Sequence, residues 1–378
     1  MIKKPTIAFV STMYSGAWGG SEDLWYSTSL LLLERGYPIA ANVCKWYEPV
    51  PKFEALIKAG ANLKYRPQDH EPNLTFPQRV KRRLQNIPPG DWLQAVHPDL
   101  VVISLSGHHQ GGEWMSACQS AGLPYVIIVH AVGDGIWPTP IAADFMRRNY
   151  EAADQCFFVS NGNLEQVRNQ IAAPLKRSSI IRNPFNVSYD ADPEWPSDET
   201  TTLACVGRLH PVSKGQDVLF SVLSQEKWKT RPLHVRLYGG GPDEASLKQL
   251  QHMYDLQNVS FAGFQSDVQQ IWRECHALVL PSRFEGLPLA IVEAMLCGRP
   301  CIVTDVAGNA ELMEDNVSGF VAAAPRTKYL DEALERAWSR RSEWRAIGAA
   351  AAKSVRELVP PDPISTFADL VQQAVPKK

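Results

Sequence analysis

The chain has 378 residues, of which 45% are hydrophobic, and this is enough apolar material for two cores. A formal net charge of −2 excludes a general electrostatic attraction to nucleic acid. No stretch reaches the ~20 apolar residues that a membrane-spanning helix needs, and the first apolar run is too short for a signal peptide. We expect a soluble, cytoplasmic protein of two domains, with peripheral contact at the inner face of a membrane left open.

The cysteines favour neither disulfides nor zinc. There are seven, none of them in a C-x-x-C pair, and most lie within apolar runs. We therefore expect reduced, buried thiols. Asp190 and Asp192 form a pair of the kind that can bind a metal, but they occupy a polar, proline-containing segment, where a solvated turn is the better interpretation. The sequence predicts no metal site.

The first elements are a strand at residues 6–13, a glycine-rich loop at 15–21 and a helix at 22–35. A strand, a glycine loop and a helix can cradle a phosphate, although glycine turns also occur for steric reasons alone. The loop contains Gly19 and Gly20 but has neither a strict dinucleotide fingerprint nor a Walker lysine.

The next stretch, residues 66–95, breaks the strand–helix rhythm with five prolines. Its basic run is either a solvated helix face or a site for an anionic acceptor or for lipid headgroups. The members of the run are Arg79, Lys81, Arg82 and Arg83.

Two buried strands follow, at residues 100–105 and 125–129, and the second delivers His130 to its carboxyl end. A histidine in this place can be a core residue, a metal ligand or a site residue. No partner at metal-ligand spacing accompanies it, so the metal interpretation is the weakest.

The second half restarts after a linker that ends near Thr200. A strand at 203–206 precedes Arg208 and Lys214, which place two positive charges at its carboxyl end. They can clamp a diphosphate or can be ordinary surface charges. A strand at 234–238 then leads to the turn at 239–241, whose glycines allow a close approach of a ligand or of a neighbouring loop.

The stretch 277–304 carries two carboxylates, Glu285 and Glu293, around a predicted helix. Gly286 permits close backbone approach, and Pro288 suits a first helical turn. Two such carboxylates can accept hydrogen bonds from hydroxyls of one polar ligand, or they can be surface charges. After a strand at 301–304, a glycine turn is expected to lead into a helix beginning near Glu311, and the last helix is expected at 364–374.

The segment EGLPLAIVE, which runs from Glu285 to Glu293, resembles the signature of retaining glycosyltransferases of family 4, within glycosyl transferases group 1. The resemblance is strongest over residues 200–325. It implies an α/β fold of two Rossmann-like domains facing each other across a cleft, the GT-B architecture. The expected domains are residues 1–186, completed by a C-terminal helix at 361–378, for the acceptor and residues 187–360 for the donor.

The resemblance also implies a role for each candidate residue. Arg208 and Lys214 would stabilise the leaving diphosphate, Glu285 would hold sugar hydroxyls or oppose developing positive charge, and Glu293 would hold the ribose. His130 would contact the donor sugar, although Ala131 replaces the acidic residue that often follows it and Asp134 receives no role. The further donor-binding positions are Gly19, Gly20, Gly239, Gly240, Gly286 and Leu287.

The implied reaction is transfer of a sugar from a UDP-, GDP- or ADP-linked donor to a glycan, lipid-linked or small-molecule acceptor, as in cell-surface polysaccharide biosynthesis. No cofactor or metal is required. A nucleotide-sugar epimerase, a phosphorylase and a non-catalytic nucleotide-sugar-binding module stay open as alternatives, because a fold does not determine a function. Trp18, Trp114 and Trp137 are candidates to stack on a sugar, or to pack in the core.

Overall fold

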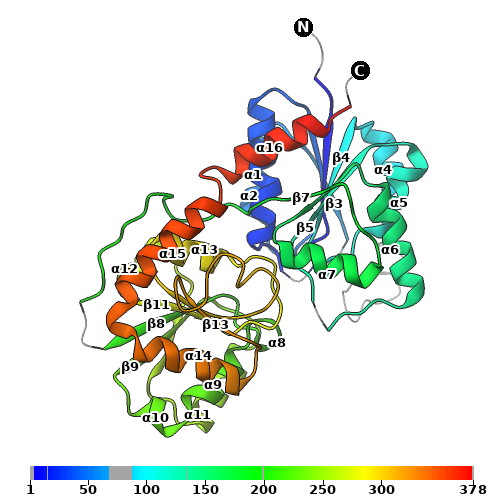
Figure 1. Ribbon diagram of the computed structural model, residues 1–378. Helices are drawn as coiled ribbons and strands as arrows, with labels where there is room; N and C mark the ends of the chain where they lie inside the picture. The colour runs from blue at the N-terminus through cyan, green and yellow to red at the C-terminus, as the bar shows by residue number, and fades with distance from the viewer. Residues whose placement is uncertain (1–3, 15, 68–86, 134, 198–199, 377–378) are drawn as a thin grey trace. The chain divides into compact units, whose positions relative to one another are not determined.

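The computed structural model describes residues 4–14, 16–67, 87–133, 135–197 and 200–376 (Figure 1). The chain divides into two compact units, Met1–Pro184 with Asp362–Lys378 (unit 1) and Phe185–Pro361 (unit 2). Each unit is built on one parallel sheet, and the predicted α/β class with two Rossmann-like units is confirmed. The basic run at 79–83 and Asp134 lie outside the described residues.

The sheet of unit 1 has the strand order β3-β2-β1-β4-β5-β6-β7, and every pairing in it is parallel. The order reverses between β1 and β4, which is where ligands bind in folds of this kind, beyond the carboxyl ends of the strands. The strands are β1 (Ile7–Ser11), β2 (Ile39–Cys44), β3 (Asn62–Arg66), β4 (Leu100–Leu105), β5 (Tyr125–Val129), β6 (Gln155–Phe158) and β7 (Ser178–Ile180).

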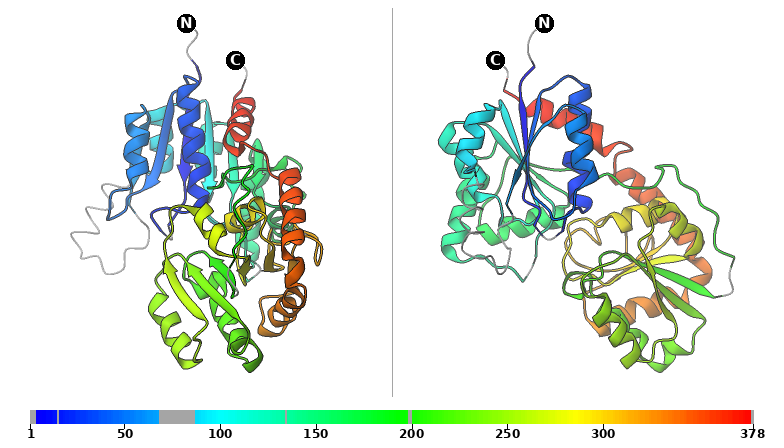
Figure 2. Two further views of the ribbon diagram at one scale, coloured as in Figure 1. Left: turned by 90° about the vertical axis from the view of Figure 1, so that its left-hand side faces the viewer. Right: turned by 180° about the vertical axis from the view of Figure 1, so that it is seen from behind.

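Helices cover both faces of this sheet (Figure 2). Successive strand residues point to opposite faces, so Val101 and Ile103 join one core while Leu100 and Val102 join the other. Because both faces are buried, central strands such as β4 and β5 are largely apolar, which explains why they are visible in the sequence, whereas β3 and β7 are only partly buried. The helices are α1 (Gly20–Glu34), α2 (Pro51–Lys58), α4 (Pro89–Val96), α5 (Gly112–Ala121), α6 (Pro140–Ala152), α7 (Asn161–Ile171) and α16 (Pro363–Ala374).

Helix α16 comes from the end of the chain and packs along α1 (Figure 1). Phe367 is buried with its ring edge against Phe157, at 5.3 Å between centroids. Arg35 of α1 ties the outer side by donating to Asp369 and Gln372, at 2.6 Å each. The last helix therefore packs into the same hydrophobic core as β1, near the start of the chain.

The sheet of unit 2 repeats the same order with its own strands, β10-β9-β8-β11-β12-β13, again entirely parallel. Its reversal point lies between β8 and β11. The strands are β8 (Thr201–Val206), β9 (Leu233–Tyr238), β10 (Val259–Gly263), β11 (Ala277–Leu280), β12 (Cys301–Thr304) and β13 (Phe320–Ala322).

One face of this second sheet packs on α9 and α14 around a core that includes Trp228 and Phe320. On the other side α13 packs against β11, β12 and α15. The helices are α8 (Pro211–Lys214), α9 (Gln216–Leu223), α10 (Glu226–Lys229), α11 (Glu244–Met253), α12 (Val268–Glu274), α13 (Leu289–Leu296), α14 (Thr327–Ser339), the 3-10 turn η1 (Arg341–Glu343) and α15 (Trp344–Leu358).

The expected helix near Glu311 is wrong, because the segment after β12 is a series of turns and the next helix begins at Thr327. Local side chains satisfy the backbone there instead of a helix. Asn309 is fully buried and donates to the carbonyl of Thr304 at 3.1 Å, and the Ser318 hydroxyl accepts from the amide of Glu314 at 2.9 Å. Side chains of this type commonly compete with helix formation.

All seven cysteines are buried and free, as predicted. Burial raises the pKa of several of their thiols, for example that of Cys205 to about 12. Within the part of the chain that the structure describes, no helix is both long and apolar enough to span a bilayer.

Candidate functional site

The loops that follow β8 and β11 meet at the reversal point of the unit 2 sheet. Lys214 is the last residue of α8, after β8, and Glu285 lies in the loop between β11 and α13. The Lys214 Nζ lies 2.6 Å from Oε1 of Glu285, with the side chains 22% and 8% exposed. Two predicted site residues that are far apart in the sequence are therefore brought together where an α/β sheet binds its ligands.

The carboxylate of Glu285 is held from its own loop. The Ser282 hydroxyl donates to Oε1 at 2.7 Å, and the Thr304 hydroxyl donates to the carbonyl of Ser282 at 2.6 Å. All three residues are buried. Glu285 therefore occupies a set position before any ligand arrives, which limits the ordering that binding would require.

Gly215 lets the α8 loop lie directly on the β11 loop. It has φ +67°, and a Cβ added to it would come within 1.9 Å of the carbonyl oxygen of Pro281. Arg283 braces the same contact, because its amide donates to Ser213 O and its guanidinium binds both carboxylate oxygens of Asp217. The Lys214–Glu285 pair thus rests on a backbone contact that only glycine permits.

Arg208 lies on the loop after β8, beside the glycine turn after β9. A Cβ added to Gly239, which has φ +125°, would come within 2.2 Å of the carbonyl oxygen of Gly207. The amide of Leu209 donates to Gly240 O at 3.0 Å, and Gln216 donates to the carbonyl of Arg208 at 2.8 Å. The glycines at 239 and 240 therefore pack against the loop that carries Arg208.

Glu293 lies inside α13 and is 3% exposed. Its Oε1 accepts from both the amide and the side chain of Asn186, at 2.9 Å each. Gly286 and Leu287 connect Glu285 to the start of this helix, and the Gly286 carbonyl accepts from the amide of Gly308 at 2.9 Å. The structure gives Glu293 an internal partner, and its predicted role toward a ribose stays a prediction.

His130 directly follows β5 in unit 1. Its Nε2 lies 3.1 Å from the hydroxyl of Ser104, and the residue is buried. Burial lowers the pKa of His130 to about 3, and a side-chain hydrogen bond with Asn183 offsets this only in part. The imidazole is therefore neutral near pH 7 and acts as a hydrogen-bonding group rather than as a cation.

Gly19 and Gly20 open α1 in unit 1. Gly19 is the N-cap in an extended conformation, and its carbonyl accepts from the amide of Glu22 at 2.9 Å. The Glu22 side chain is buried, and it accepts from the Ser11 hydroxyl and from the Trp25 indole, at 2.9 Å in each case. Burial is the main cause that raises the pKa of Glu22 to about 7.

The three candidate tryptophans have different fates. Trp114 is buried against Trp92, so it is a core residue. Trp18 packs on Tyr26, with ring centroids 5.4 Å apart. Trp137 is 69% exposed. Stacking on a sugar therefore stays open for Trp137 and is excluded for the buried face of Trp114.

Some residues that shape the site were missed from the sequence. Ser282 stands three positions before Glu285, directly beyond a strand, and that position is a usable signal. The sequence predicted Asn186 only as part of the crossing between the domains. Ser104 lies in a predicted strand and Glu22 in a predicted helix, and neither position gave a sign of a role in the site. Asp190 and Asp192 are exposed, as predicted, and the described residues contain no cluster of three or more metal-ligating His, Cys, Asp or Glu side chains.

Comparison with known proteins gives a family match within the second half of the chain. Residues 200–340 match the family model Glycosyl transferases group 1. This segment contains Lys214, Glu285 and Glu293, so the resemblance carried by those residues is confirmed at the level of group 1.

Several curated proteins with related sequences are named as glycosyltransferases. The chain is 31% identical over 182 residues to the lipopolysaccharide 1,6-galactosyltransferase of Escherichia coli, covering 45% of this chain and 48% of that protein. It is 30% identical over 210 residues to the alpha-D-kanosaminyltransferase of Streptomyces kanamyceticus, covering 52% and 54%. The chain thus spans about half the length of these relatives.

Solved structures support the fold over nearly the whole chain. Anabaena HepE in complex with UDP superposes with a TM-score of 0.75 and 17% identity, over 97% of this chain and 100% of that one. HepE has also been solved with UDP-glucose, and that structure gives a TM-score of 0.74. At this identity the likeness concerns architecture, and it agrees with two Rossmann-like units.

Proposed function

We propose that this protein is a retaining glycosyltransferase of family 4 that moves a sugar from a nucleotide-diphosphate sugar to an acceptor. The observation that carries the proposal is the Lys214–Glu285 pair at the reversal point of the unit 2 sheet. It lies inside the segment that matches Glycosyl transferases group 1. Its members, a cation and a buried carboxylate, are the two charges that glycosyl transfer needs.

The charges suit the changes that occur in the reaction. When the bond between the sugar and the diphosphate breaks, negative charge develops on the leaving group and positive charge on the sugar ring. Lys214 neutralises the first, together with Arg208 on the neighbouring loop. Glu285 opposes the second or holds sugar hydroxyls. Because Lys214 is bound to Glu285 before the donor arrives, donor phosphate competes for the same ammonium group.

The remaining candidates hold the donor. Glu293 binds the ribose hydroxyls, while Gly239, Gly240, Gly286 and Leu287 line the approach of the nucleotide. In unit 1, neutral His130 exchanges hydrogen bonds with a hydroxyl of the transferred sugar. Its lowered pKa supports this part, since a neutral ring can both donate and accept.

For the retaining mechanism we propose attack from the same face that the leaving group vacates. The bond between the anomeric carbon and the diphosphate oxygen breaks while a bond to the acceptor oxygen forms. The acceptor's proton passes to the leaving phosphate. This route uses no carboxylate nucleophile and no metal, so every step depends on positioning and on charge stabilisation.

We assign the acceptor to the expected domain 1–186 with its C-terminal helix 361–378 and the donor to 187–360. UDP-hexoses are the first donors to test, because HepE binds UDP and UDP-glucose. One relative named above is a lipopolysaccharide galactosyltransferase and the other a kanosaminyltransferase, so lipid-linked, polysaccharide and small-molecule acceptors belong in the same screen. We place the reaction in the cytoplasm, at the inner face of the membrane when the acceptor is lipid-linked.

The test begins with thermal unfolding in the presence of UDP, GDP, ADP and their sugars, since a ligand of the folded state raises the unfolding temperature. The donor that shifts it is then incubated with acceptors, and NMR reports the anomeric configuration of the product. Retention supports the proposal, and inversion contradicts its mechanism. Release of nucleotide with a changed sugar and no acceptor would identify an epimerase, and a requirement for inorganic phosphate would identify a phosphorylase.

A further inference from the structure

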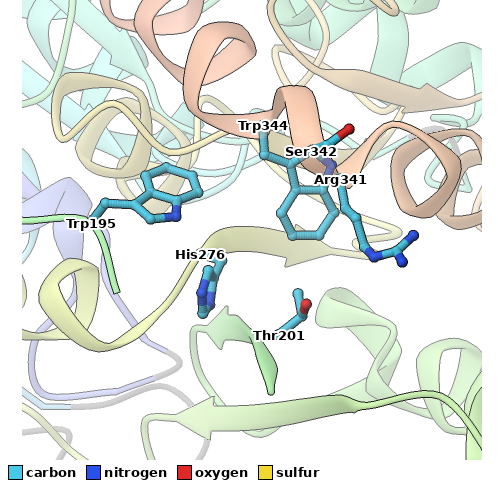
Figure 3. Close-up of a pocket in the computed structure, with 6 residues that line it drawn as sticks. All are labelled: Trp195, Thr201, His276, Arg341, Ser342 and Trp344. Atoms are coloured by element: carbon cyan, nitrogen blue, oxygen red, sulfur yellow. The ribbon is translucent and has the colours of Figure 1, made fainter. Parts of the chain in front are cut away.

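A pocket of about 330 Å³ lies at the amino ends of the unit 2 strands, at the edge of the sheet opposite Lys214 and Glu285 (Figure 3). Thr201 is the first residue of β8 and His276 directly precedes β11, so both stand at the amino ends of the strands. Lys214 and Glu285 follow the carboxyl ends of the same two strands. In a parallel sheet these ends form opposite edges, and the pocket is therefore separate from the proposed donor site.

One wall of the pocket is Trp195, whose ring is held by a buried arginine. The Arg299 guanidinium lies 4.8 Å from the centre of the ring. The same guanidinium donates to the carbonyls of Pro193 and Glu194, at 3.3 and 2.6 Å, and so fixes the backbone that carries the tryptophan. The His276 ring packs against Trp195 at 5.8 Å and 80°. An aromatic surface is thus in place without an ordering cost on binding.

Trp344, at the start of α15, also lines the pocket, but it belongs to the core of unit 2 and is only 2% exposed. Its indole nitrogen donates to the carbonyl of Ala337 at 2.8 Å, so the polar edge of the ring is already satisfied. Trp195, which is partly exposed, is therefore the aromatic side chain that a ligand would contact. Figure 3 shows Trp195 and Trp344 around one hollow, with His276 and Thr201 beside them.

Polar groups complete the lining. The amide of Thr202 donates to Nδ1 of His276 at 3.1 Å, which places the proton of the neutral ring on Nε2. Thr201 and Ser342 add hydroxyls. Arg341 is exposed, donates to the carbonyl of Trp338 at 3.2 Å, and has its guanidinium 4.7 Å from the centre of the Trp338 ring. Among the six lining residues there is one cation and no acidic group.

We propose that this pocket binds an acidic sugar, one or two rings long, whose carboxylate or phosphate pairs with Arg341. Aromatic surfaces pack on the apolar faces of sugar rings, and hydroxyl and imidazole groups exchange hydrogen bonds with ring hydroxyls. A guanidinium binds either anion with two parallel hydrogen bonds. Resting on the proposed glycosyltransferase function, the ligand is a segment of an anionic glycan held away from the transfer site.

The experiment is calorimetric titration of the full chain with glucuronic acid, glucose 6-phosphate and glucose. We expect the acidic sugars to bind with a Kd on the order of 1 mM and glucose at least ~5-fold more weakly, the range of small single-site ligands. Comparing the two acids separates a carboxylate ligand from a phosphate ligand. Arg341→Gln should weaken the acidic sugars at least ~5-fold, to the level of glucose.

Arg345→Gln is the matched control, because Arg345, the second residue of α15, is an exposed arginine that does not line the pocket. It should leave binding unchanged. Trp195→Leu tests the aromatic wall and should weaken all three sugars together. Equal binding of glucose and both acids, or full binding by a folded Arg341→Gln protein, would overturn the proposal.

Two controls separate this pocket from the donor site. UDP should not displace the acidic sugars, and displacement would place them in the donor site and refute the second pocket. UDP should still raise the unfolding temperature of Arg341→Gln. If UDP and its sugars fail to bind wild type while the acidic sugars bind, the proposed transferase function fails and the pocket stands.

Discussion

The two units share the order of six strands, with β7 as an additional edge strand in unit 1, but the carboxyl edges of their sheets carry different chemistry. In unit 2 the edge holds a full charge pair, Lys214 with Glu285. In unit 1 burial lowers the pKa of His130 and raises that of Glu22, so both are driven toward their neutral forms. One scaffold thus provides charge where a diphosphate would leave and neutral hydrogen-bonding groups where hydroxyls would be recognised.

The largest expected effect is on the charged edge. Lys214→Ala removes the ammonium that we propose faces the leaving group, and we expect kcat to fall by at least ~10²-fold, the scale for losing one transition-state donor. Lys248→Ala is the control, since Lys248 pairs with Glu244 on the surface of α11. Full turnover by a folded Lys214→Ala protein would show that the charge at the edge of the unit 2 sheet has no role in the reaction.

The neutral edge has its own signature in pH. Burial raises the pKa of Glu22 in the folded protein to about 7, whereas the ordinary pKa of a glutamate is 4.5, so this group makes the stability fall as the pH rises between those values. The loss is on the order of 3 kcal/mol, from 1.36 kcal/mol per pH unit. Glu22→Gln should abolish that component, and chemical denaturation at pH 5 and pH 8 measures it.

Glu34→Gln provides the comparison for that experiment, because Glu34 lies on the same helix and is exposed. Its stability should follow the wild-type pH dependence. A Glu22→Gln protein whose denaturation midpoint changes with pH as strongly as wild type would show that Glu22 ionises normally. The contrast between the edges would then rest on His130 alone.

A smaller effect concerns the backbone beneath the charge pair. Gly215→Ala introduces a Cβ in a left-handed conformation against the carbonyl of Pro281, and we expect a loss of about 2 kcal/mol in the free energy of unfolding. Gly240→Ala is matched to it in the same unit, because a Cβ there meets nothing within 4 Å. Calorimetry of both variants should separate them, and similar unfolding temperatures would contradict the proposed close packing.

The smallest effect is at the surface of unit 1. Arg35→Ala breaks the contacts with Asp369, Gln372 and Ser365, and partly exposed contacts of this kind contribute up to about 1 kcal/mol. Hydrogen exchange should accelerate in α16. Arg148→Ala, which removes an exposed pair with Asp144 on α6, should leave α16 unchanged. Equal exchange in both variants would mean that the buried face of α16, with Phe367, Ala368 and Val371, holds the helix without Arg35.

The central strands were predicted well because they are buried on both faces and form apolar runs, as at residues 125–129 and 277–280, whereas β3, β7 and β13 were not expected. Polar residues that follow such runs were correctly placed at the carboxyl edges: His130 directly after β5, and Lys214 and Glu285 in the segments after β8 and β11. In this fold a strand that ends in a charged or imidazole group already gives the group's approximate location.

What the sequence could not provide was the set of partners. Asn186 and Glu293 are 107 residues apart and meet only through tertiary packing. The burial that shifts the pKa of Glu22 depends on how α1 lies against β1, and its position in the helix gives no sign of that. The helix expected near Glu311 was wrong for a similar reason, since buried Asn309 uses its side chain to bind the end of β12.

The return of the chain to unit 1 sets the order in which the two halves can finish during synthesis. The first segment of unit 1 ends at Pro184 and the second begins at Asp362, so all of Phe185–Pro361 is synthesised before α16. At 5 to 20 residues per second this interval lasts roughly 10 to 35 s. During this interval the face of α1 that later packs against α16 is not yet covered by that helix. Unit 2 can therefore complete its fold on the ribosome before unit 1 does.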